Sequence, residues 1–362
     1  MYSDRISTTS RYNMLVADLK RNEANFNKLT LQLASGKKVT SITDDPIAAV
    51  NIVNTNRQIG QIDTFNKNAG LAKEELDTLD DLMELADGYL TQAWDKAVQA
   101  NNGTYAQTSL SALKTEIDEI TKTMVDLANT EFNDNFIFAG ANTKLTPYEI
   151  DEYGNVIYRG TPQDNPDYKR QTEIADGVFE VINTTGDKVF GYYEAYSEDT
   201  SGNKYYAKAD DAGNVKYYDK DGNEYTGDVS QLTAKENYSG VMGALRMLSN
   251  SIQEVIDAKD AKDADAETVA SKKMFETLDM FAESHNDILT EQTKFGGVYN
   301  RLEMTESTLE TNSESLTSYL SSIQDIDIAE AASKWVQAQY AYQASMQVTA
   351  STMNMSLLNY LS

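Results

Sequence analysis

The sequence predicts a mainly α fold, in which a long coiled-coil-like helical bundle is made from both chain ends and a β-rich insertion domain lies in the middle. Apolar residues recur at three- and four-residue spacing through both ends of the 362-residue chain, which is typical of amphipathic helices. The chain has four prolines, at positions 46, 147, 162 and 166. The segments 47–146 and 167–362 therefore lack the residue that breaks helices most strongly. Between the ends this spacing disappears.

The first helix is predicted to end before Gly36, because glycine readily takes the positive φ that follows many helices. Polar Asn22 occupies one position of its 3-4 rhythm. The remaining positions form an apolar stripe of Tyr12, Leu15, Leu19, Phe26, Leu29 and Leu33.

A second helix is predicted to begin at Asp44-Asp45-Pro46, with an acidic N-cap and a proline in the first turn. It runs to about residue 100, and its stripe contains Leu76, Leu79, Met83, Ala86, Leu90 and Ala93. Asn101-Asn102-Gly103 predicts a break. A third helix follows, with a stripe of Leu110, Leu113, Ile117, Ile120, Met124 and Leu127.

Residues 136–235 are predicted to form the β-rich insertion. A short pattern recurs there as GNVIY at 154–158, GNKYY at 202–206, GNVKYY at 213–218 and GNEY at 222–225. Gly-Asn supplies the positive φ of tight hairpin turns, and the aromatic and β-branched residues that follow suit strands. The tyrosines between 192 and 218 fit either cross-strand pairs or exposed contacts.

The C-terminal half has a stronger helical signal. Apolar residues recur every seven positions at Met274, Phe281, Ile288, Phe295, Leu302, Leu309, Leu316 and Ile323. This spacing predicts a coiled-coil-like helix, with a break or kink at Gly296-Gly297. The charged segment 258–267 is predicted to be an exposed linker. The last helix covers about 327–361, with a small-residue face of Ala331, Trp335, Ala338, Tyr342, Met346, Thr349 and Met353.

These elements predict three parts: terminal assembly helices (1–43 and 325–362), a helical bundle domain (44–135 and 236–324) and an outer insertion (136–235). An apolar stripe without a core of its own must pack on the other terminus, on a neighbouring copy, or on both. The candidate assembly interface is Leu15, Leu19, Phe26, Leu29, Leu33, Ile328, Trp335, Tyr342, Met346, Met353, Leu357 and Leu358.

Charge and composition exclude several classes of protein. With 31 basic and 57 acidic residues, the formal net charge is −26, which argues against nucleic acid and against a polybasic membrane anchor. The absence of cysteine excludes disulfides. The N-terminal residues lack the apolar run of a cleaved signal peptide, and no stretch approaches the roughly 20 apolar residues of a membrane span. Alone, these observations favour the cytoplasm, and they leave export without a cleaved signal open.

Catalytic and ligand-binding motifs are weak. The single histidine, His285, lies in the 3-4 rhythm between Phe281 and Ile288 and is predicted to be a packing residue. Zinc-protease, nucleophile-elbow, P-loop and Rossmann patterns do not occur. Asp44 and Asp45 are predicted to be caps. DKDGNE at 219–224 has Glu224 at the sixth loop position, where a calcium loop needs glycine, and Ser230 at the twelfth, where it needs glutamate, so a hairpin turn is favoured over a weak ion site. We therefore predict no catalytic, cofactor or metal residues.

Several segments resemble the flagellin family. LASGKKVTSITDDPIAAV (33–50) is similar to the N-terminal signature of flagellins, and AVQANNGTY (97–105) to a turn of that family. NDNFIFAG (133–140), GGVYNRLE (296–303), SSIQDIDIAEAA (321–332) and MSLLNYL (355–361) resemble the hook-associated branch. The resemblance covers about residues 1–150 and 240–362. The start before RIST and the tyrosine-rich residues 190–230 depart from the family pattern.

The resemblance implies a structural component of the bacterial flagellum: a hook-associated adaptor that joins hook to filament by self-assembly of its terminal helices. It implies export through the type III apparatus without a cleaved signal, an export chaperone beforehand, and a ring of copies between a neighbouring hook-associated protein and flagellin. A filament flagellin or minor flagellin is the alternative within the family. An enzyme displayed on the flagellum through the insertion is the alternative from another class.

Overall fold

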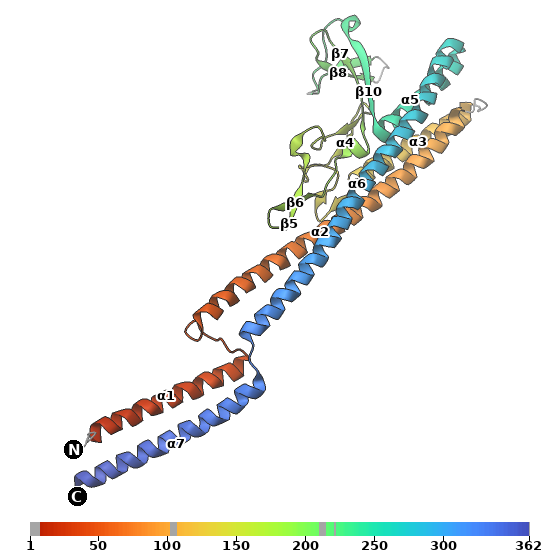
Figure 1. The fold of residues 1–362 in the computed structure, drawn as a ribbon. Helices are drawn as coiled ribbons and strands as arrows, with labels where there is room; N and C mark the ends of the chain where they lie inside the picture. Colours follow the sequence, from red (N-terminus) through yellow and green to blue (C-terminus); the bar gives the residue numbers. More distant parts are fainter. Residues whose placement is uncertain (1–7, 102–106, 210–214, 221, 362) are drawn as a thin grey trace. The chain divides into compact units, whose positions relative to one another are not determined.

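The computed structural model describes residues 8–101, 107–209, 215–220 and 222–361, with side chains over 10–101, 107–208, 215–220 and 222–352. The chain forms two compact units, one from residues 1–64 with 308–362 and the other from 65–307. The long helices are α1 Thr8–Ser35, α2 Pro46–Asn101, α3 Gln107–Ala128, α5 Gly240–Ala261, α6 Ala264–Gln324 and α7 Ile328–Leu361 (Figure 1).

The helix ends in the N-terminal third follow the sequence signals. Gly36, directly after α1, has a φ of 71°, as expected of a glycine that ends a helix. At the start of α2, the Asp45 carboxylate accepts hydrogen bonds from the N–H groups of Ile47 and Ala48, both at 3.0 Å. Asp45 is therefore the N-cap of α2, as the sequence predicted. The predicted break at 101–103 lies mostly outside the described residues.

The seven-residue repeat of α6 lies on its buried face. Six of its eight members are buried, from Met274 to Leu309, and Leu316 and Ile323 are half-buried. The predicted break at Gly296-Gly297 is wrong, because α6 is continuous across both glycines. Glycine keeps the backbone N–H that a helix needs, and the neighbouring Phe295 is buried and holds this turn against the core.

The prediction of a linker at 258–267 is also wrong. α5 continues to Ala261 and α6 begins at Ala264, so only two residues connect the helices. Lys262 adopts the left-handed conformation with a φ of 58°. The Asp263 carboxylate then accepts a 3.0 Å hydrogen bond from the N–H of Ala266 and caps α6. Most of the charged side chains in this segment are exposed, as predicted.

The strands occupy residues 131–239, slightly more than the predicted 136–235. The largest sheet is antiparallel in the order β3-β4-β7-β8-β9, with β10 on β7. Two small hairpins, β1-β2 and β5-β6, and the short helix α4 Gly186–Val189 accompany it. The strands are β1 Glu131–Phe132, β2 Asn135–Phe136, β3 Tyr148–Ile150, β4 Val156–Tyr158, β5 Gln171–Ala175, β6 Val178–Val181, β7 Tyr192–Glu198, β8 Lys204–Ala209, β9 Val215–Tyr218 and β10 Thr233–Ser239.

The Gly-Asn turns share one hydrogen-bond pattern. Gly202 has a φ of 85°, and the Asp199 carboxylate accepts bonds from the backbone N–H and the side-chain amide of Asn203, both at 2.9 Å. The same bonds join Asp151 to Asn155 and Asp219 to Asn223. The predicted turns are confirmed at these three sites, and the copy at 210–214 lies outside the described residues.

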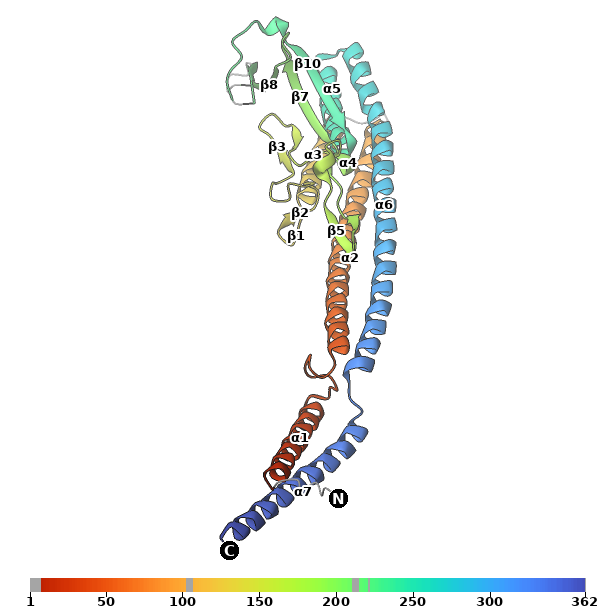
Figure 2. The same ribbon diagram turned by 60° about the vertical axis from the view of Figure 1, so that its left-hand side comes forward.

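In Figure 2 the strands of the insertion lie against the helices of residues 65–307, and buried side chains from both form one core. Phe138 and Phe190, both fully buried, meet edge to face with ring centroids 4.8 Å apart. The Tyr148 hydroxyl donates a 2.8 Å hydrogen bond to the Gly191 carbonyl, and burial raises the pKa of this tyrosine well above its usual value. Three ion pairs tie the insertion to the helices: Arg170–Glu75, Arg301–Glu180 and Lys188–Asp287.

Candidate assembly surface

The two terminal helices, α1 and α7, pack along each other within the unit formed by residues 1–64 and 308–362 (Figure 1). The Phe26 ring lies against two rings of α7, with centroids 5.6 Å from Trp335 and 5.8 Å from Tyr342. Aromatic pairs at such distances add about 0.5–1.5 kcal/mol each beyond their buried area. The stripes of the two ends are therefore partners of each other.

Polar contacts fix the register of this pair. The Trp335 indole N–H donates a 2.8 Å hydrogen bond to the Thr30 hydroxyl. Nearer the chain ends, the Asn22 amide donates a 2.6 Å bond to the Ser345 hydroxyl. Asn22, the polar position in the apolar stripe, thus faces a polar partner. A single polar pair in an apolar seam selects one register over its alternatives.

The connections after α1 and before α7 are joined to each other. The N–H of Lys38 donates a 2.7 Å bond to the Gln324 carbonyl, and the N–H of Ile326 donates a 3.0 Å bond to the Gly36 carbonyl. Lys37 and Asp325 form an isolated antiparallel bridge. The two connections therefore form a short ladder of their own.

Asp44 holds the loop between α1 and α2. Its carboxylate accepts bonds from the Thr40 N–H at 3.1 Å, the Thr40 hydroxyl at 2.9 Å and the Ser41 N–H at 3.1 Å. The Lys28 ammonium lies 2.9 Å away. Hydrogen bonds from Lys28 and Thr40 lower the pKa of Asp44 from 3.8 to about 2. Asp44 and Asp45 thus have the structural roles of loop anchor and N-cap.

The predicted interface residues occupy two environments. Those on α1 are half-buried, as are Trp335 and Tyr342 on α7. Ile328 and Met346, in contrast, are exposed. Met353, Leu357 and Leu358 lie beyond the described side chains. The half-buried members are Leu15, Leu19, Phe26, Leu29, Leu33, Trp335 and Tyr342.

On the part of α7 that α1 leaves uncovered, a second apolar pattern winds around the helix, and of its members the sequence analysis predicted only Ile328 as an interface residue. Residues 328, 332, 336, 340, 344 and 348 are Ile, Ala, Val, Tyr, Ala and Val, and all are exposed. The large members expose 67% (Ile328), 42% (Val336), 67% (Tyr340) and 49% (Val348) of their surface. Residues at four-residue spacing form a ridge that crosses a helix obliquely and fits the groove of another helix. We call these six residues the α7 ridge.

Charge is distributed unevenly between the two units. Residues 65–307 contain 46 acidic and 22 basic residues, whereas the rest of the chain contains 11 and 9. From Trp335 to the end the sequence has no charged residue. The α7 ridge from Val336 onward is therefore free of the strong like-charge repulsion that opposes contact between acidic surfaces.

The other candidate residues have structural environments. His285 is half-buried, and its Nδ1 pairs with the Asp87 carboxylate on α2. At 219–224, Asp219 is bonded to Asn223, and Asp221 lies outside the described residues. Across the described ranges, no group of three or more His, Cys, Asp or Glu residues is arranged to hold a metal ion. Within the same ranges no helix is both long and apolar enough to cross a membrane.

The fold, with paired terminal helices and a β-rich insertion, is that of a flagellar structural protein. Two family descriptions match: the bacterial flagellin N-terminal helical region over residues 6–143 and the bacterial flagellin C-terminal helical region over 278–361. Together they span more than half of the chain, which belongs to the flagellin family.

Within that family, the chain is similar to proteins of the hook-associated type. It is 25% identical to flagellar hook-associated protein 3 of Escherichia coli over 354 residues, 98% of either chain. It is 24% identical to a flagellin of Clostridium tyrobutyricum, over 89% of this chain and 92% of that one. The crystal structure of flagellar hook-associated protein 3 from Legionella pneumophila has the same fold, with a TM-score of 0.56 at 16% identity, covering 75% of this chain and 98% of that chain.

Proposed function

We propose that this protein is the hook-associated adaptor that joins the flagellar hook to the filament. It acts as a structural component and not as an enzyme. Full-length similarity to a hook-associated protein 3 supports this assignment. The observation that carries the mechanism is the α7 ridge, an uncharged apolar row that the α1–α7 pair leaves exposed.

In this proposal the α7 ridge is buried only on assembly. Each copy contributes its α1–α7 pair to a ring, with a neighbouring hook-associated protein on one side and flagellin on the other. A fully buried Val or Ile contributes about 1.5–3 kcal/mol relative to an exposed one, before ordering costs. Contacts of this size, repeated around a ring, are sufficient to hold a joint between two tubes.

The proposal includes the route to that position. The protein leaves the cell through the type III export apparatus without a cleaved signal, after an export chaperone has bound its C-terminal region. It then resides outside the cell in the flagellum. The absence of cysteine suits this route, because an unfolded chain then passes without forming disulfides.

Two tyrosines on α7 provide a sharp test of the ridge. Tyr340 is exposed on the ridge, and Tyr342, two residues away, packs on Phe26. In a deletion strain, Tyr340→Glu should be secreted normally and keep its thermal stability but reduce attached filaments at least ten-fold, because an unpaired buried charge costs several kcal/mol. Filament subunits should accumulate in the medium.

Tyr342→Phe is the matched control, since it keeps the ring that contacts Phe26 and should support normal filaments. Secretion is measured separately from assembly by quantifying the variant in the medium. Normal filament number with Tyr340→Glu would remove the ridge from the assembly surface.

A filament flagellin or minor flagellin is the second candidate, favoured by the similarity to a Clostridium flagellin. Quantifying copies per filament separates the two functions. A junction protein is present in a handful of copies, whereas a filament subunit is present in thousands.

A further inference from the structure

The first turns of α2 expose an apolar surface that the described chain leaves uncovered. Ile47, Val50 and Val53 lie three residues apart and expose 76%, 59% and 66% of their surface. Residues at three-residue spacing form a ridge on a helix, and we call these three the α2 ridge. Ile42, in the loop before the helix, is 72% exposed as well. Large apolar residues gathered in this way are typical of a contact surface.

The side of α2 that faces inward in this region is a different one. Thr55 is buried there, and Ala48, Ile52 and Ile59 are half-buried. These four positions follow the 3-4 spacing of a single helix face. Like α7, this part of α2 therefore has one covered stripe and a second apolar surface that is exposed.

The α2 ridge is uncharged along its length. Residues 46–56 contain no Asp, Glu, Lys or Arg. Asp45 caps the start of the helix, and exposed Arg57, one turn after Val53, is its first charged residue. The charges therefore lie at the two ends of the ridge and do not interrupt it. A partner that packs on the ridge buries apolar surface there without burying a charge.

The α7 ridge requires a partner of this kind, and other surfaces of the same unit do not supply one. On α1, exposed Met14 and Leu31 are separated by four exposed charged residues. Between residues 308 and 324, α6 exposes one large apolar residue, Tyr319. Among the described helices of residues 1–64 and 308–362, only α2 and α7 have three or more large exposed apolar residues at regular helical spacing.

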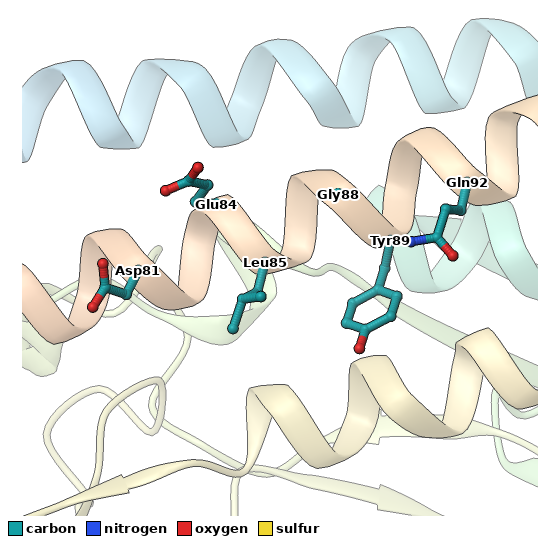
Figure 3. A pocket seen from close by; sticks show the side chains of 6 residues that line it. All are labelled: Asp81, Glu84, Leu85, Gly88, Tyr89 and Gln92. Atoms are coloured by element: carbon teal, nitrogen blue, oxygen red, sulfur yellow. The ribbon is translucent and has the colours of Figure 1, made fainter.

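The surface of residues 65–307 suits the α7 ridge less, as a groove on α2 illustrates. This groove has a volume of about 620 Å³ and is lined by Asp81, Glu84, Leu85, Gly88, Tyr89 and Gln92 (Figure 3). Asp81 and Glu84 are exposed and lie within one turn of Leu85. An apolar partner on Leu85 would take these carboxylates out of water, and the α7 ridge from Val336 onward offers no counter-charge.

We propose that the α2 ridge of one copy packs against the α7 ridge of a neighbouring copy. The α2 ridge has three-residue spacing and the α7 ridge four-residue spacing. Three-residue ridges of one helix fit the four-residue grooves of another at a crossing angle of about +20°, whereas two three-residue ridges cross almost at right angles, which is rarer. The spacing therefore favours α7 over a second α2 as the occupant.

The contact joins two different surfaces, so it is heterologous. Each copy can bind one neighbour through its α2 ridge and another through its α7 ridge. Contacts of this type close into rings or continue as helical assemblies. The inference rests on the proposed function, in which the α7 ridge is buried on assembly, and it adds the surface that buries it.

Disulfide trapping between two single variants tests the contact, because the chain has no cysteine of its own. A tagged copy carries one cysteine on the α2 ridge, as Ile47→Cys, Val50→Cys or Val53→Cys. An untagged copy carries one on the α7 ridge, as Ala332→Cys, Val336→Cys, Ala344→Cys or Val348→Cys. Both full-length copies are assembled together on flagella of a deletion strain.

A disulfide requires Cα atoms about 4.4–6.8 Å apart. At least one pairing should therefore give a tagged heterodimer on mild oxidation, and no variant alone should form a dimer. Leu85→Cys, at the groove on the same helix, is the matched control and should give no heterodimer with any α7 variant.

Two results would overturn the contact. One is normal filament number without a heterodimer in any pairing. The other is a dimer from a single variant alone, which would mean that a ridge packs on its own copy in the neighbour. Failure of the wild-type chain to restore filaments to the deletion strain would instead contradict the proposed junction function, so the two failures are distinguishable.

Charge on the α2 ridge gives an independent test. Val50→Glu should be folded and secreted, because the side chain is exposed in the monomer, but should reduce attached filaments at least ten-fold by placing an unpaired charge in the contact. Leu85→Glu, also at an exposed position of α2, should assemble normally. Normal filaments with Val50→Glu, or an equal loss with Leu85→Glu, would show that the α2 ridge is not the docking surface.

Discussion

At the scale of single residues, the charged carboxylate of Asp44 holds the loop between α1 and α2. Its carboxylate collects the bonds from Thr40 and Ser41, and the Lys28 ammonium lies beside it. Because the folded-state pKa is lowered from 3.8 to about 2, the ionised form stabilises the fold. That stabilisation is fully present above the ordinary pKa and is lost as the pH falls through about 2.

Asp44→Asn should therefore lower the free energy of unfolding of the terminal unit by about 1 kcal/mol at pH 7, the usual size of such a contribution. Thermal melts of wild type and variant, followed by circular dichroism, should differ at pH 7 and converge between pH 4 and pH 2. A difference that stays constant over that range would contradict the assignment. Asp45→Asn, which retains an N-cap acceptor, should change the melt little.

Single-residue environments on α7 were only partly predictable. Trp335 and Tyr342 follow the strongest apolar period, and the structure places both against Phe26. Tyr340 and Val336 lie outside that period, because α7 carries two apolar patterns and the stronger one conceals the weaker. The sequence does show the ridge, as uncharged residues at four-residue spacing. It indicates a second contact surface only once the main stripe of α7 is known to pack on α1.

At the scale of elements, the helices and the Gly-Asn turns were predictable, and the connection between α5 and α6 was not. The seven-residue repeat correctly predicted the buried face of α6, because residues seven positions apart lie on the same side of a helix. The connection at Lys262 was misread as a linker because charge indicates exposure and says nothing about backbone conformation. Asp263, an N-cap residue type, was the signal that the next helix begins at once.

The helices of the two units should differ in hydrogen exchange. α1 and α7 bury few side chains fully, Ala331 and Ala338 among them, whereas α2, α3, α5 and α6 line a continuous core over residues 65–307. Amide protons of the terminal pair should therefore exchange at least ten-fold faster in the monomer. Equal protection in both units, measured by mass spectrometry on a proven monomer, would contradict this expectation.

The sheet defines how much of the tyrosine-rich segment is dispensable. Thr233 of β10 pairs with Glu198 of β7, so Asn-Gly in place of residues 199–232 would close a two-residue hairpin and remove β8 and β9. This variant should keep its melting temperature within about 3 °C, because the replaced residues contribute little to the core.

Removal of residues 190–230 is the informative comparison. It deletes Phe190 and Tyr193, which are buried in the core, and loss of one large buried aromatic side chain costs about 3–5 kcal/mol. This longer deletion should give a variant that aggregates or is not secreted. Equal stability of the two deletions would mean that β7 is not part of the core.

At the scale of the whole molecule, the uneven charge predicts a salt effect. Residues 65–307 carry 46 acidic and 22 basic residues, so neighbouring copies repel one another there. The Debye length is about 30 Å at 0.01 M salt and about 8 Å at 0.15 M. Self-association of purified protein should therefore increase at least several-fold over this range, as measured by sedimentation. Association that weakens with salt would mean that ion pairs dominate the contact.

The hydrogen bonds between the two connections have a mechanical consequence. Gly36 and Lys38 on one segment are bonded to Ile326 and Gln324 on the other, so the chain passes this point twice with the two passages tied together. A tensile load on α1 is shared with the segment that leads to α7, and the cross-bonds between the segments are loaded in shear. These hydrogen bonds must break together before either of the two connecting segments can extend without the other. Torque applied to the terminal helices is thus carried by two hydrogen-bonded segments of the chain instead of one.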